Sequence, residues 1–243
     1  MTEALLVASK VTKRFGGFVA LEAVDLSLAQ GERVGLIGPN GSGKSTLVNC
    51  IAGTLRHAGG SIVFDGQDLG SLPPHRRIRL GIARSFQIPR PFASMTVQDN
   101  LCIPLLYAGS AEARARRGDV ASEAMAILGQ VGLEAKAHHL SGELTQVDLR
   151  KLELARAIAS RPKLLIADEV LAGLSTGEVD DVLAILLEMK ARGVAVIMIE
   201  HIMRAVMRFS ERIAVLVAGR KVADGAPEAV LHDPEVERAY LGE

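Results

Sequence analysis

The most chemically specific stretch of the sequence is residues 38–45, which read GPNGSGKS and fit the phosphate-binding pattern G-x-x-x-x-G-K-[ST] at every required position. Glycines let consecutive backbone N–H groups turn toward an anion, the lysine reaches the outer phosphates, and the last hydroxyl ligates Mg²⁺. We therefore predict a nucleotide-binding loop. Its predicted contacts are Gly38, Pro39, Asn40, Gly41, Ser42, Gly43, Lys44, Ser45 and Thr46, and Ser45 is also a predicted Mg²⁺ ligand.

A pair of carboxylates, Asp168 and Glu169, ends the apolar run 164–167. In a protein with a phosphate-binding loop, the carboxyl end of such a strand lies beside the nucleotide. We predict that Asp168 holds the Mg²⁺ shell and that Glu169 polarises the water that attacks the γ-phosphate. The alternative interpretation is an ordinary strand end with two solvated acids.

Two further polar residues follow apolar runs. His201 comes after the run 194–199, where an imidazole can hydrogen-bond the γ-phosphate or position the water. Gln87 ends the stretch 82–86, and its amide oxygen can ligate Mg²⁺. Spacing alone leaves both open to structural roles, because a lone histidine is often solvated and a glutamine can cap a turn.

These residues need a scaffold of buried parallel strands. The runs 164–167 and 194–199 are apolar throughout, which is typical of central strands covered on both faces. The segments 33–37 and 46–52 predict a strand and a helix on either side of the loop. An amphipathic crossover helix is predicted between the two apolar runs from Val182, Ile185, Leu186 and Met189, with a capping box at Ser175 and Glu178.

The remaining segments divide into an antiparallel part and a helical part. Alternating apolar positions predict antiparallel strands at 4–11, 19–28 and 60–66 and a hairpin from 213–217 and 221–223. Helices are predicted from 96 and over 120–128. We predict one domain over residues 1–243, in which 1–86 and 161–243 form a core with an antiparallel β subdomain and 87–160 form an inserted helical subdomain.

Composition excludes some classes of function. The chain of 243 residues is 49% hydrophobic, and its 28 basic and 28 acidic residues give no electrostatic argument for a nucleic-acid partner. The basic run 114–117 is interpreted as a solvated face. Cys50 and Cys102 lack metal-ligand spacing and are predicted to be buried thiols in a reducing compartment. No signal peptide or long apolar run is visible, so we expect any membrane association to be peripheral.

Taken in this order, the motifs resemble the ATPase subunit of an ATP-binding cassette (ABC) transporter over essentially the whole chain. The resemblance implies an α/β fold with a phosphate-binding-loop (RecA-like) parallel-sheet core, and ATP and Mg²⁺ as ligands. It implies catalytic roles for Glu169, for His201 as the switch histidine, and for Gln87, with Gln87 and Asp168 contacting the metal. It places the aromatic that stacks on adenine at Phe15, for which the alternative is a strand core residue.

Two positions depart from the family pattern. The signature, commonly Leu-Ser-Gly-Gly-Gln, falls at residues 144–148 when counted back from 152–156. Thr145 there supplies a hydroxyl at a helix N-terminus, where the dipole favours a γ-phosphate, whereas Val147 replaces a glycine and restricts close backbone approach. The loop 172–175 ends in Ser175 where the family often has Asp or Asn. We hypothesise slow hydrolysis or dependence on a partner ATPase with intact motifs.

The family mechanism implies two such chains face to face, each ATP lying between the phosphate-binding loop of one chain and the signature helix of the other. The second ATPase chain is the same or a related one. Closure and reopening would move membrane-spanning permease subunits, which contact the helical subdomain at Gln87 and are served by a solute-binding protein. This implies a peripheral location on the cytoplasmic face of the inner membrane, with no nucleic-acid partner.

Four stretches indicate the subfamily: 13–18, 83–92, 95–101 and 239–242 resemble the ATPases of bacterial branched-chain amino-acid importers. A urea or short-amide importer and the lipopolysaccharide-export ATPase stay as alternatives, because ATPase subunits do not bind the transported solute. Soluble ABC ATPases of DNA repair are disfavoured because the chain has no room for a long coiled coil, and ribosomal ones because it has one cassette. A small-molecule kinase would not explain Glu169, His201 and the helix at Thr145 together.

Overall fold

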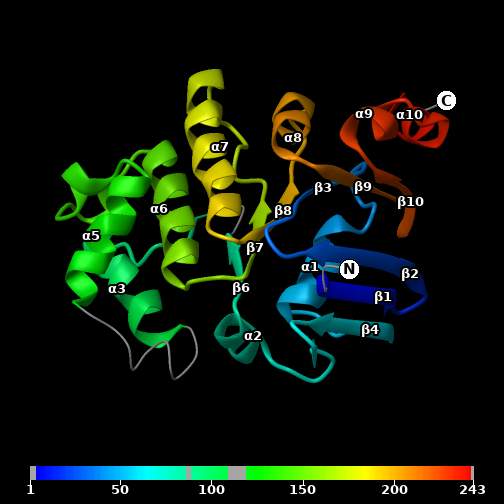
Figure 1. Ribbon diagram of the computed structural model, residues 1–243, viewed down its shortest axis with the longest axis horizontal. Coiled ribbons are helices and arrows are strands. Elements are labelled where there is room, and N and C mark those ends of the chain that lie inside the picture. The colour runs from blue at the N-terminus through cyan, green and yellow to red at the C-terminus, as the bar shows by residue number, and fades with distance from the viewer. Residues whose placement is uncertain (1–3, 86–88, 109–118, 242–243) are drawn as a thin grey trace.

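The computed structural model describes residues 4–85, 89–108 and 119–241 and contains two β-sheets with helices around them (Figure 1). The larger sheet has six strands in the order β10-β9-β3-β8-β7-β6, and all neighbours are parallel except the β9/β10 pair. Its strands are β3 (Arg33–Ile37), β6 (Ile82–Ser85), β7 (Leu164–Asp168), β8 (Ala195–Ile199), β9 (Arg212–Val217) and β10 (Arg220–Gly225). The predicted strands around the nucleotide loop and the predicted C-terminal hairpin are therefore present.

The two faces of this sheet are buried in different cores. Every residue of β7 and β8 is buried, as their continuous apolar sequence predicts. Because side chains alternate along a strand, Leu165 and Val196 pack with the helices α6 (Gln146–Ala159), α7 (Thr176–Ala191) and α8 (Met203–Phe209). Leu164 and Ile197 face the other core, which contains α1 (Lys44–Ala52) and residues of the second sheet.

The second sheet is antiparallel and has the order β2-β1-β4-β5. Its strands are β1 (Ala4–Phe15), β2 (Phe18–Ala29), β4 (Gly59–Phe64) and β5 (Gln67–Asp68). The predicted strands 4–11 and 19–28 fall inside β1 and β2, whereas the predicted strand 60–66 overlaps β4, which ends at Phe64. The strands β1 and β2 run to a tight hairpin in which Phe15 pairs with Phe18. This hairpin reaches the nucleotide loop, so the antiparallel sheet contributes directly to the candidate site.

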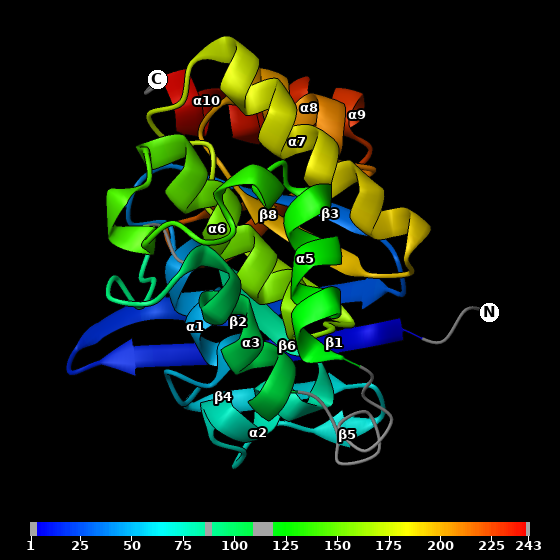
Figure 2. The same ribbon diagram turned by 90° about the vertical axis from the view of Figure 1, so that its left-hand side faces the viewer.

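A helical layer lies at one end of the molecule, seen face-on in Figure 2. It contains α3 (Val97–Tyr107), α5 (Val120–Gln130) and α6, with short 3-10 turns at η1 (Glu134–Lys136) and η2 (Ser141–Glu143). Thr96 caps α3 by accepting a hydrogen bond from the Asp99 N–H at 3.1 Å, and Asp119 caps α5 through the Ala121 N–H at 3.0 Å. The predicted helix positions are confirmed, whereas the subdomain boundaries at 87 and 160 stay a prediction.

Four shorter helices complete the described chain, and α2 and α8 were not predicted. They are α2 (Pro74–Leu80), α8, α9 (Pro227–Leu231) and α10 (Pro234–Leu241). Both cysteines are free. Cys50 is buried and Cys102 is half-buried, and burial raises the pKa of both thiols. The prediction of a fully buried thiol is wrong for Cys102, because α3 leaves it half-buried at the edge of its core. No helix in the described ranges has the length and apolarity that spanning a membrane requires.

Candidate nucleotide site

The predicted phosphate-binding loop connects β3 to α1, and two of its glycines, Gly38 and Gly43, are required by close packing. Gly38 has φ 146° and Gly43 has φ 106°, values that other residues rarely adopt. A Cβ atom on Gly38 would lie 2.0 Å from the carbonyl oxygen of Leu216 in β9, and one on Gly43 would lie 2.8 Å from that of Ala20 in β2. The loop is therefore held between both sheets in a conformation that only glycine permits.

Lys44 is the buried cation of this loop. Its Nζ donates hydrogen bonds to the carbonyl oxygens of Gly38 at 2.7 Å and Pro39 at 3.0 Å. Burial lowers the pKa of Lys44, and the charges of Glu169 and Asp168 oppose that shift. Among the residues that the structure describes, no side chain caps the N-terminus of α1, so its first-turn N–H groups can bind an anion. Such an anion would also compete with the carbonyl oxygens of Gly38 and Pro39 for the Lys44 ammonium.

A cavity of about 270 Å³ opens over this loop and brings together residues from distant parts of the chain. It is lined by Phe15, Phe18, Ala20, Asn40, Gly41, Ser42, Gly43, Lys44, Ser45, Thr46, Glu169 and His201. Most of the predicted nucleotide contacts therefore share one cavity. Gly38, Pro39 and Asp168 are not part of this lining. Thr145 and Val147 are also absent from it and lie at the N-terminal end of α6.

Glu169 and His201 meet at the edge of the cavity. Glu169 follows β7 with a φ of 50°, and its N–H donates to the Ile199 carbonyl at 2.9 Å, which extends the β7/β8 ladder by one bond. The Nε2 of His201 lies 3.2 Å from Oε1 of Glu169. The geometry thus places a carboxylate and an imidazole in hydrogen-bond contact beside the Lys44 ammonium, an arrangement able to hold and polarise a water.

Asp168 is buried behind Glu169 and is bound by an arginine that the sequence analysis did not single out. Nη2 of Arg84 donates to Oδ2 of Asp168 at 2.6 Å, and Nη1 donates to Oδ1 of Asn49 at 2.5 Å. Carboxylate and hydroxyl oxygens are suitable Mg²⁺ ligands, so Asp168 and Ser45 fit the predicted metal. In the described ranges no three His, Cys, Asp or Glu residues form a cluster that could hold a metal ion.

Two aromatic rings stand at the β1/β2 hairpin tip beside the cavity. Phe15 is 46% exposed and Phe18 is 64% exposed, so the alternative of a strand core residue at Phe15 does not hold. The Nζ of Lys13 lies 4.9 Å from the centre of the Phe15 ring. Phe18 was missed in the sequence, although a phenylalanine at the opposite end of a Gly-Gly turn is the signal that could have identified it.

Thr145 caps α6 as predicted, but its hydroxyl is already engaged. Its Oγ1 accepts a hydrogen bond from the Asp148 N–H at 3.2 Å and donates one to Oδ2 of Asp148 at 2.8 Å. Lys136 also binds this carboxylate. Burial acts to raise the pKa of Asp148, but Lys136 and Thr145 outweigh it and hold the pKa below its usual value. The first turn of α6 therefore carries a negative charge.

Glu200 is a buried acid next to Glu169 and His201, and it was not predicted from the sequence. It lies between β8 and His201, and its Oε1 accepts a hydrogen bond from the Leu171 N–H at 2.8 Å. Burial raises the pKa of Glu200 to about 7, helped by the nearby charge of Glu169 and opposed by the Leu171 and His201 N–H groups and by Arg150.

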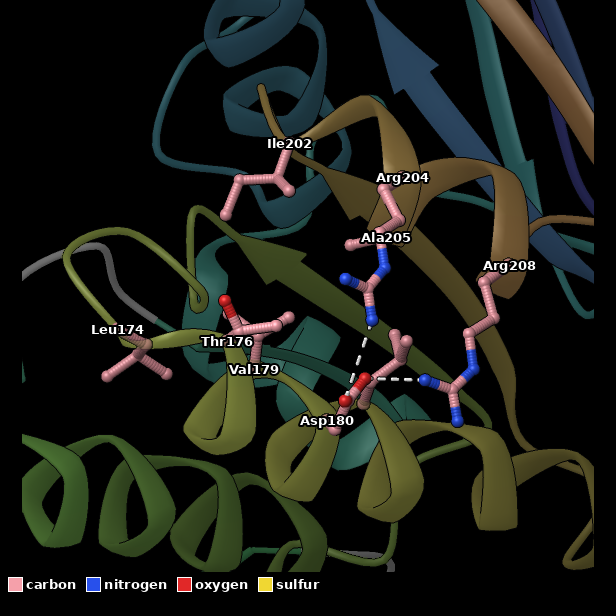
Figure 3. Close-up of a pocket in the computed structure, with 9 residues that line it drawn as sticks. Leu174, Thr176, Val179, Asp180, Ile202, Arg204, Ala205 and Arg208 are labelled. Atoms are coloured by element: carbon pink, nitrogen blue, oxygen red, sulfur yellow. Dashed lines mark hydrogen bonds and ion pairs between the residues drawn. The ribbon is translucent and has the colours of Figure 1, made fainter.

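A separate pocket of about 140 Å³ lies between α7 and α8 (Figure 3). Asp180 of α7 binds Arg208 of α8 at 2.5 Å and Arg204 at 3.7 Å, and Figure 3 shows both guanidinium groups pointing toward this carboxylate.

At the start of α7, Oε2 of Glu178 accepts a hydrogen bond from the Ser175 N–H at 2.7 Å, which confirms the predicted capping box.

A larger groove of about 390 Å³ separates α2 and β6 from the helical layer. Its lining combines apolar side chains with charged ones. The residues are His75, Ile78, Arg79, Ala83, Arg84, Ile103, Pro104, Tyr107, Ala108, Glu153, Arg156, Ala157 and Ser160. Gln87 and the basic run 114–117 lie outside the described residues.

Comparisons with known proteins agree with this geometry. A family model described as "ABC transporter" matches residues 21–172, more than half of the chain. The chain is 37% identical to the high-affinity branched-chain amino acid transport ATP-binding protein BraF of Pseudomonas aeruginosa, with 100% of both chains covered. A crystal structure of the ADP conformation of an ATP-binding cassette of an ABC transporter has 32% identity, covers 100% of both chains and superposes with a TM-score of 0.89. A dimeric bacterial ABC transporter cassette has 25% identity and a TM-score of 0.81, covering 91% of this chain and 98% of its own.

Proposed function

Because the chain belongs to the ABC transporter family, we propose that it hydrolyses ATP to energise the uptake of branched-chain or related amino acids by a membrane complex. The observation that carries the proposal is the single cavity in which the phosphate-binding loop meets Glu169 and His201. The proposed cargo rests on the relative in Pseudomonas aeruginosa, a branched-chain amino acid transport ATP-binding protein that aligns over its full length.

In this proposal the loop residues bind the phosphates of ATP through backbone N–H groups and the Lys44 ammonium. The exposed rings of Phe15 and Phe18 are the candidates for stacking on adenine. Ser45, Asp168 and Gln87 would hold Mg²⁺, which when bound neutralises the charge that develops on the phosphates. Each of these contacts is made by this chain's own residues.

Glu169 would accept a hydrogen bond from the attacking water and polarise it, because its carboxylate lines the phosphate cavity. His201 would keep Glu169 oriented through the 3.2 Å contact between Nε2 and Oε1, and it would sense the γ-phosphate beside it. These roles support an in-line attack of water in which the protein supplies position and charge rather than covalent chemistry.

A second ATPase chain would complete the site, because Thr145 and the signature segment 144–148 lie away from the cavity of their own chain. The occurrence of a dimeric cassette among the structural neighbours supports such pairing. Val147 blocks the close approach that glycine permits, and the Asp148 carboxylate repels a phosphate at the α6 N-terminus. We therefore favour a heterodimer with two unequal ATP sites. The partner's signature segment would promote hydrolysis of the ATP bound to this chain. This chain's signature segment would promote hydrolysis of the ATP bound to the partner less effectively.

The groove between α2, β6 and the helical layer is the proposed docking site for membrane-spanning permease subunits. Ile78 and Tyr107 at this groove are exposed large side chains, and Arg79 adds a basic group to its lining. A short cytoplasmic helix of the permease would place apolar residues against Ile78 and Tyr107 and an acidic one against Arg79. The helical segment 87–160 would then act as the inserted subdomain, with the chain peripheral on the cytoplasmic face and a solute-binding protein acting only through the permease.

The proposed function is tested by uptake of labelled leucine in the cells that naturally produce the chain, after its deletion. Return of uptake with the wild-type chain, but not with Glu169→Gln, is the expected result. Leucine uptake that is unaffected by deletion would contradict the proposed cargo. Labelled urea and short amides, together with surface lipopolysaccharide, are assayed in the same strains because they distinguish the related transport systems.

A further inference from the structure

The carboxylate of Glu200 is the hydrogen-bond acceptor for a buried backbone N–H group, that of Leu171. Glu200 is only 3% exposed, and glutamate is seldom buried unless it has a specific partner. Its partner is the Leu171 N–H, which donates to Oε1 at 2.8 Å within the protein interior. Leu171 itself is 0% exposed, so water does not provide an alternative acceptor there.

The bond stabilises the turn that follows Glu169. The last register pair of β7 and β8 is Asp168 with Ile199, and the Glu169 N–H donates to the Ile199 carbonyl just beyond it. The chain then leaves the sheet, because Glu169 has a φ of 50°. Leu171, two residues past Glu169, is fully buried, and a buried donor without an acceptor costs roughly 1–3 kcal/mol. Glu200 therefore continues the ladder with a side chain.

This position couples the two residues that meet at the cavity. Glu200 precedes His201 directly, and it binds the backbone two residues after Glu169. The charged groups that face it are Glu169 itself and Arg150 of α6, whose Nη1 lies 3.4 Å from the Glu169 carbonyl oxygen. The ion pairs of Asp180 with Arg204 and Arg208 also join the segments that follow β7 and β8 (Figure 3), but their side chains are exposed, whereas Glu200 is buried.

We infer that Glu200 is a positioning residue for ATP hydrolysis, which holds the turn 169–171 so that the Glu169 carboxylate faces His201 and the attacking water. The inference rests on the proposed ATPase function and deepens it. Glu200 is buried and its side chain binds the Leu171 N–H, so its role is to position Glu169 rather than to bind ATP. Its loss should therefore lower the rate of hydrolysis while leaving the affinity for ATP in place.

The test measures kcat, KM and the dissociation constant for ATP with the chain in its membrane complex. In Glu200→Leu the acceptor is lost, and kcat is expected to fall about 10- to 100-fold because a catalytic group displaced by ~1 Å loses that much rate. KM and the dissociation constant are expected to stay within about twofold, since the phosphate-binding loop is untouched. Glu200→Gln keeps an amide oxygen for the Leu171 N–H and is expected to restore most of kcat.

A matched control is Glu211→Leu. Glu211 also accepts a backbone hydrogen bond, from the Arg33 N–H at 3.2 Å, but it lies outside the cavity lining, so kcat should not change. If Glu200→Leu does not accumulate as folded protein, Glu200→Asp decides the question, because the shorter side chain withdraws the oxygen from the Leu171 N–H and should lower kcat with ATP binding unchanged.

The inference is overturned if Glu200→Leu and Glu200→Asp keep the wild-type kcat, if kcat and ATP affinity fall together, or if Glu200→Gln is as slow as Glu200→Leu. A wild-type complex that does not hydrolyse ATP overturns the proposed function, and the inference with it. A wild-type complex that hydrolyses ATP, beside an unaffected Glu200→Leu, overturns the inference alone.

Discussion

The Arg84 guanidinium lies 2.6 Å from the Asp168 carboxylate and binds Asn49 with its other terminal nitrogen at 2.5 Å. Three elements that surround the nucleotide loop, β6, β7 and α1, are therefore joined through one side chain. Arg84 also lines the groove proposed for the permease. Arg84 compensates the negative charge of Asp168. Since Asp168 is also the predicted metal ligand, a metal that arrives with ATP would share this carboxylate with Arg84.

Arg84→Met is expected to lower the free energy of unfolding by about 3 kcal/mol without nucleotide, because it leaves a buried carboxylate without its cation. Saturating Mg²⁺ and ATP should reduce the difference, since a divalent cation at Asp168 replaces the lost charge. Denaturant unfolding of both proteins, with and without Mg²⁺ and ATP, measures this. Arg220→Met is the control, because Arg220 pairs with Glu22 at the surface and its loss should change little. A difference that MgATP leaves unchanged would contradict metal binding at Asp168.

Lys44→Ala is expected to weaken ATP binding about 100-fold or more, because charge-assisted hydrogen bonds to the outer phosphates are lost. Titration with a fluorescent ATP analogue gives the dissociation constant directly. Lys163→Ala provides the control, since Lys163 is an exposed lysine that pairs with exposed Asp65. Equal affinities in Lys44→Ala and the wild type would show that the phosphates bind elsewhere.

The raised pKa of Glu200 predicts a pH dependence of stability. A carboxyl whose pKa rises from 4.5 to about 7 on folding favours the folded state below pH 4.5, and this contribution is lost as the pH rises to about 7. Glu200→Gln has no such proton to lose. The stability of the variant relative to the wild type should therefore increase with pH across this window, by at most about 3 kcal/mol. Parallel unfolding curves at pH 5 and pH 8 test this, and a constant difference would mean that Glu200 is ionised in both states.

Val147→Gly combined with Asp148→Gln is expected to raise the ATPase rate of the isolated chain severalfold, because it removes a side chain and a negative charge from the α6 N-terminus. Steady-state phosphate release is the measurement. The single variants separate the steric contribution from the electrostatic one. Rapid hydrolysis by the isolated wild-type chain, with no gain in the double variant, would contradict the idea of a weak signature.

Local chemistry made the nucleotide loop predictable, because the glycines, Lys44 and Ser45 act within one short segment. Continuous apolar runs likewise predicted β7 and β8, and with them the carboxyl edge that carries Glu169 and His201. Amphipathic spacing predicted α7, since four apolar positions recur on one face.

Contacts that depend on strand order were not predictable from the sequence. Arg84 reaches Asp168 across 84 positions, and Glu200 reaches Leu171 across 29, so both pairings exist only once β6, β7 and β8 are neighbours. Helices α2 and α8 were missed because seven residues are too few to show a helical period. Phe18 was overlooked because the predicted strands ended short of the Gly-Gly turn, whereas β1 and β2 continue to it and bring the ring to the cavity.

The most direct test of the central claim is ATP hydrolysis by the complete membrane complex in lipid vesicles, measured with and without a loaded solute-binding protein. The account predicts hydrolysis that rises when the binding protein carries leucine, isoleucine or valine, and that disappears in Glu169→Gln while ATP is still bound. Hydrolysis that ignores these amino acids, or that persists in Glu169→Gln, would contradict it.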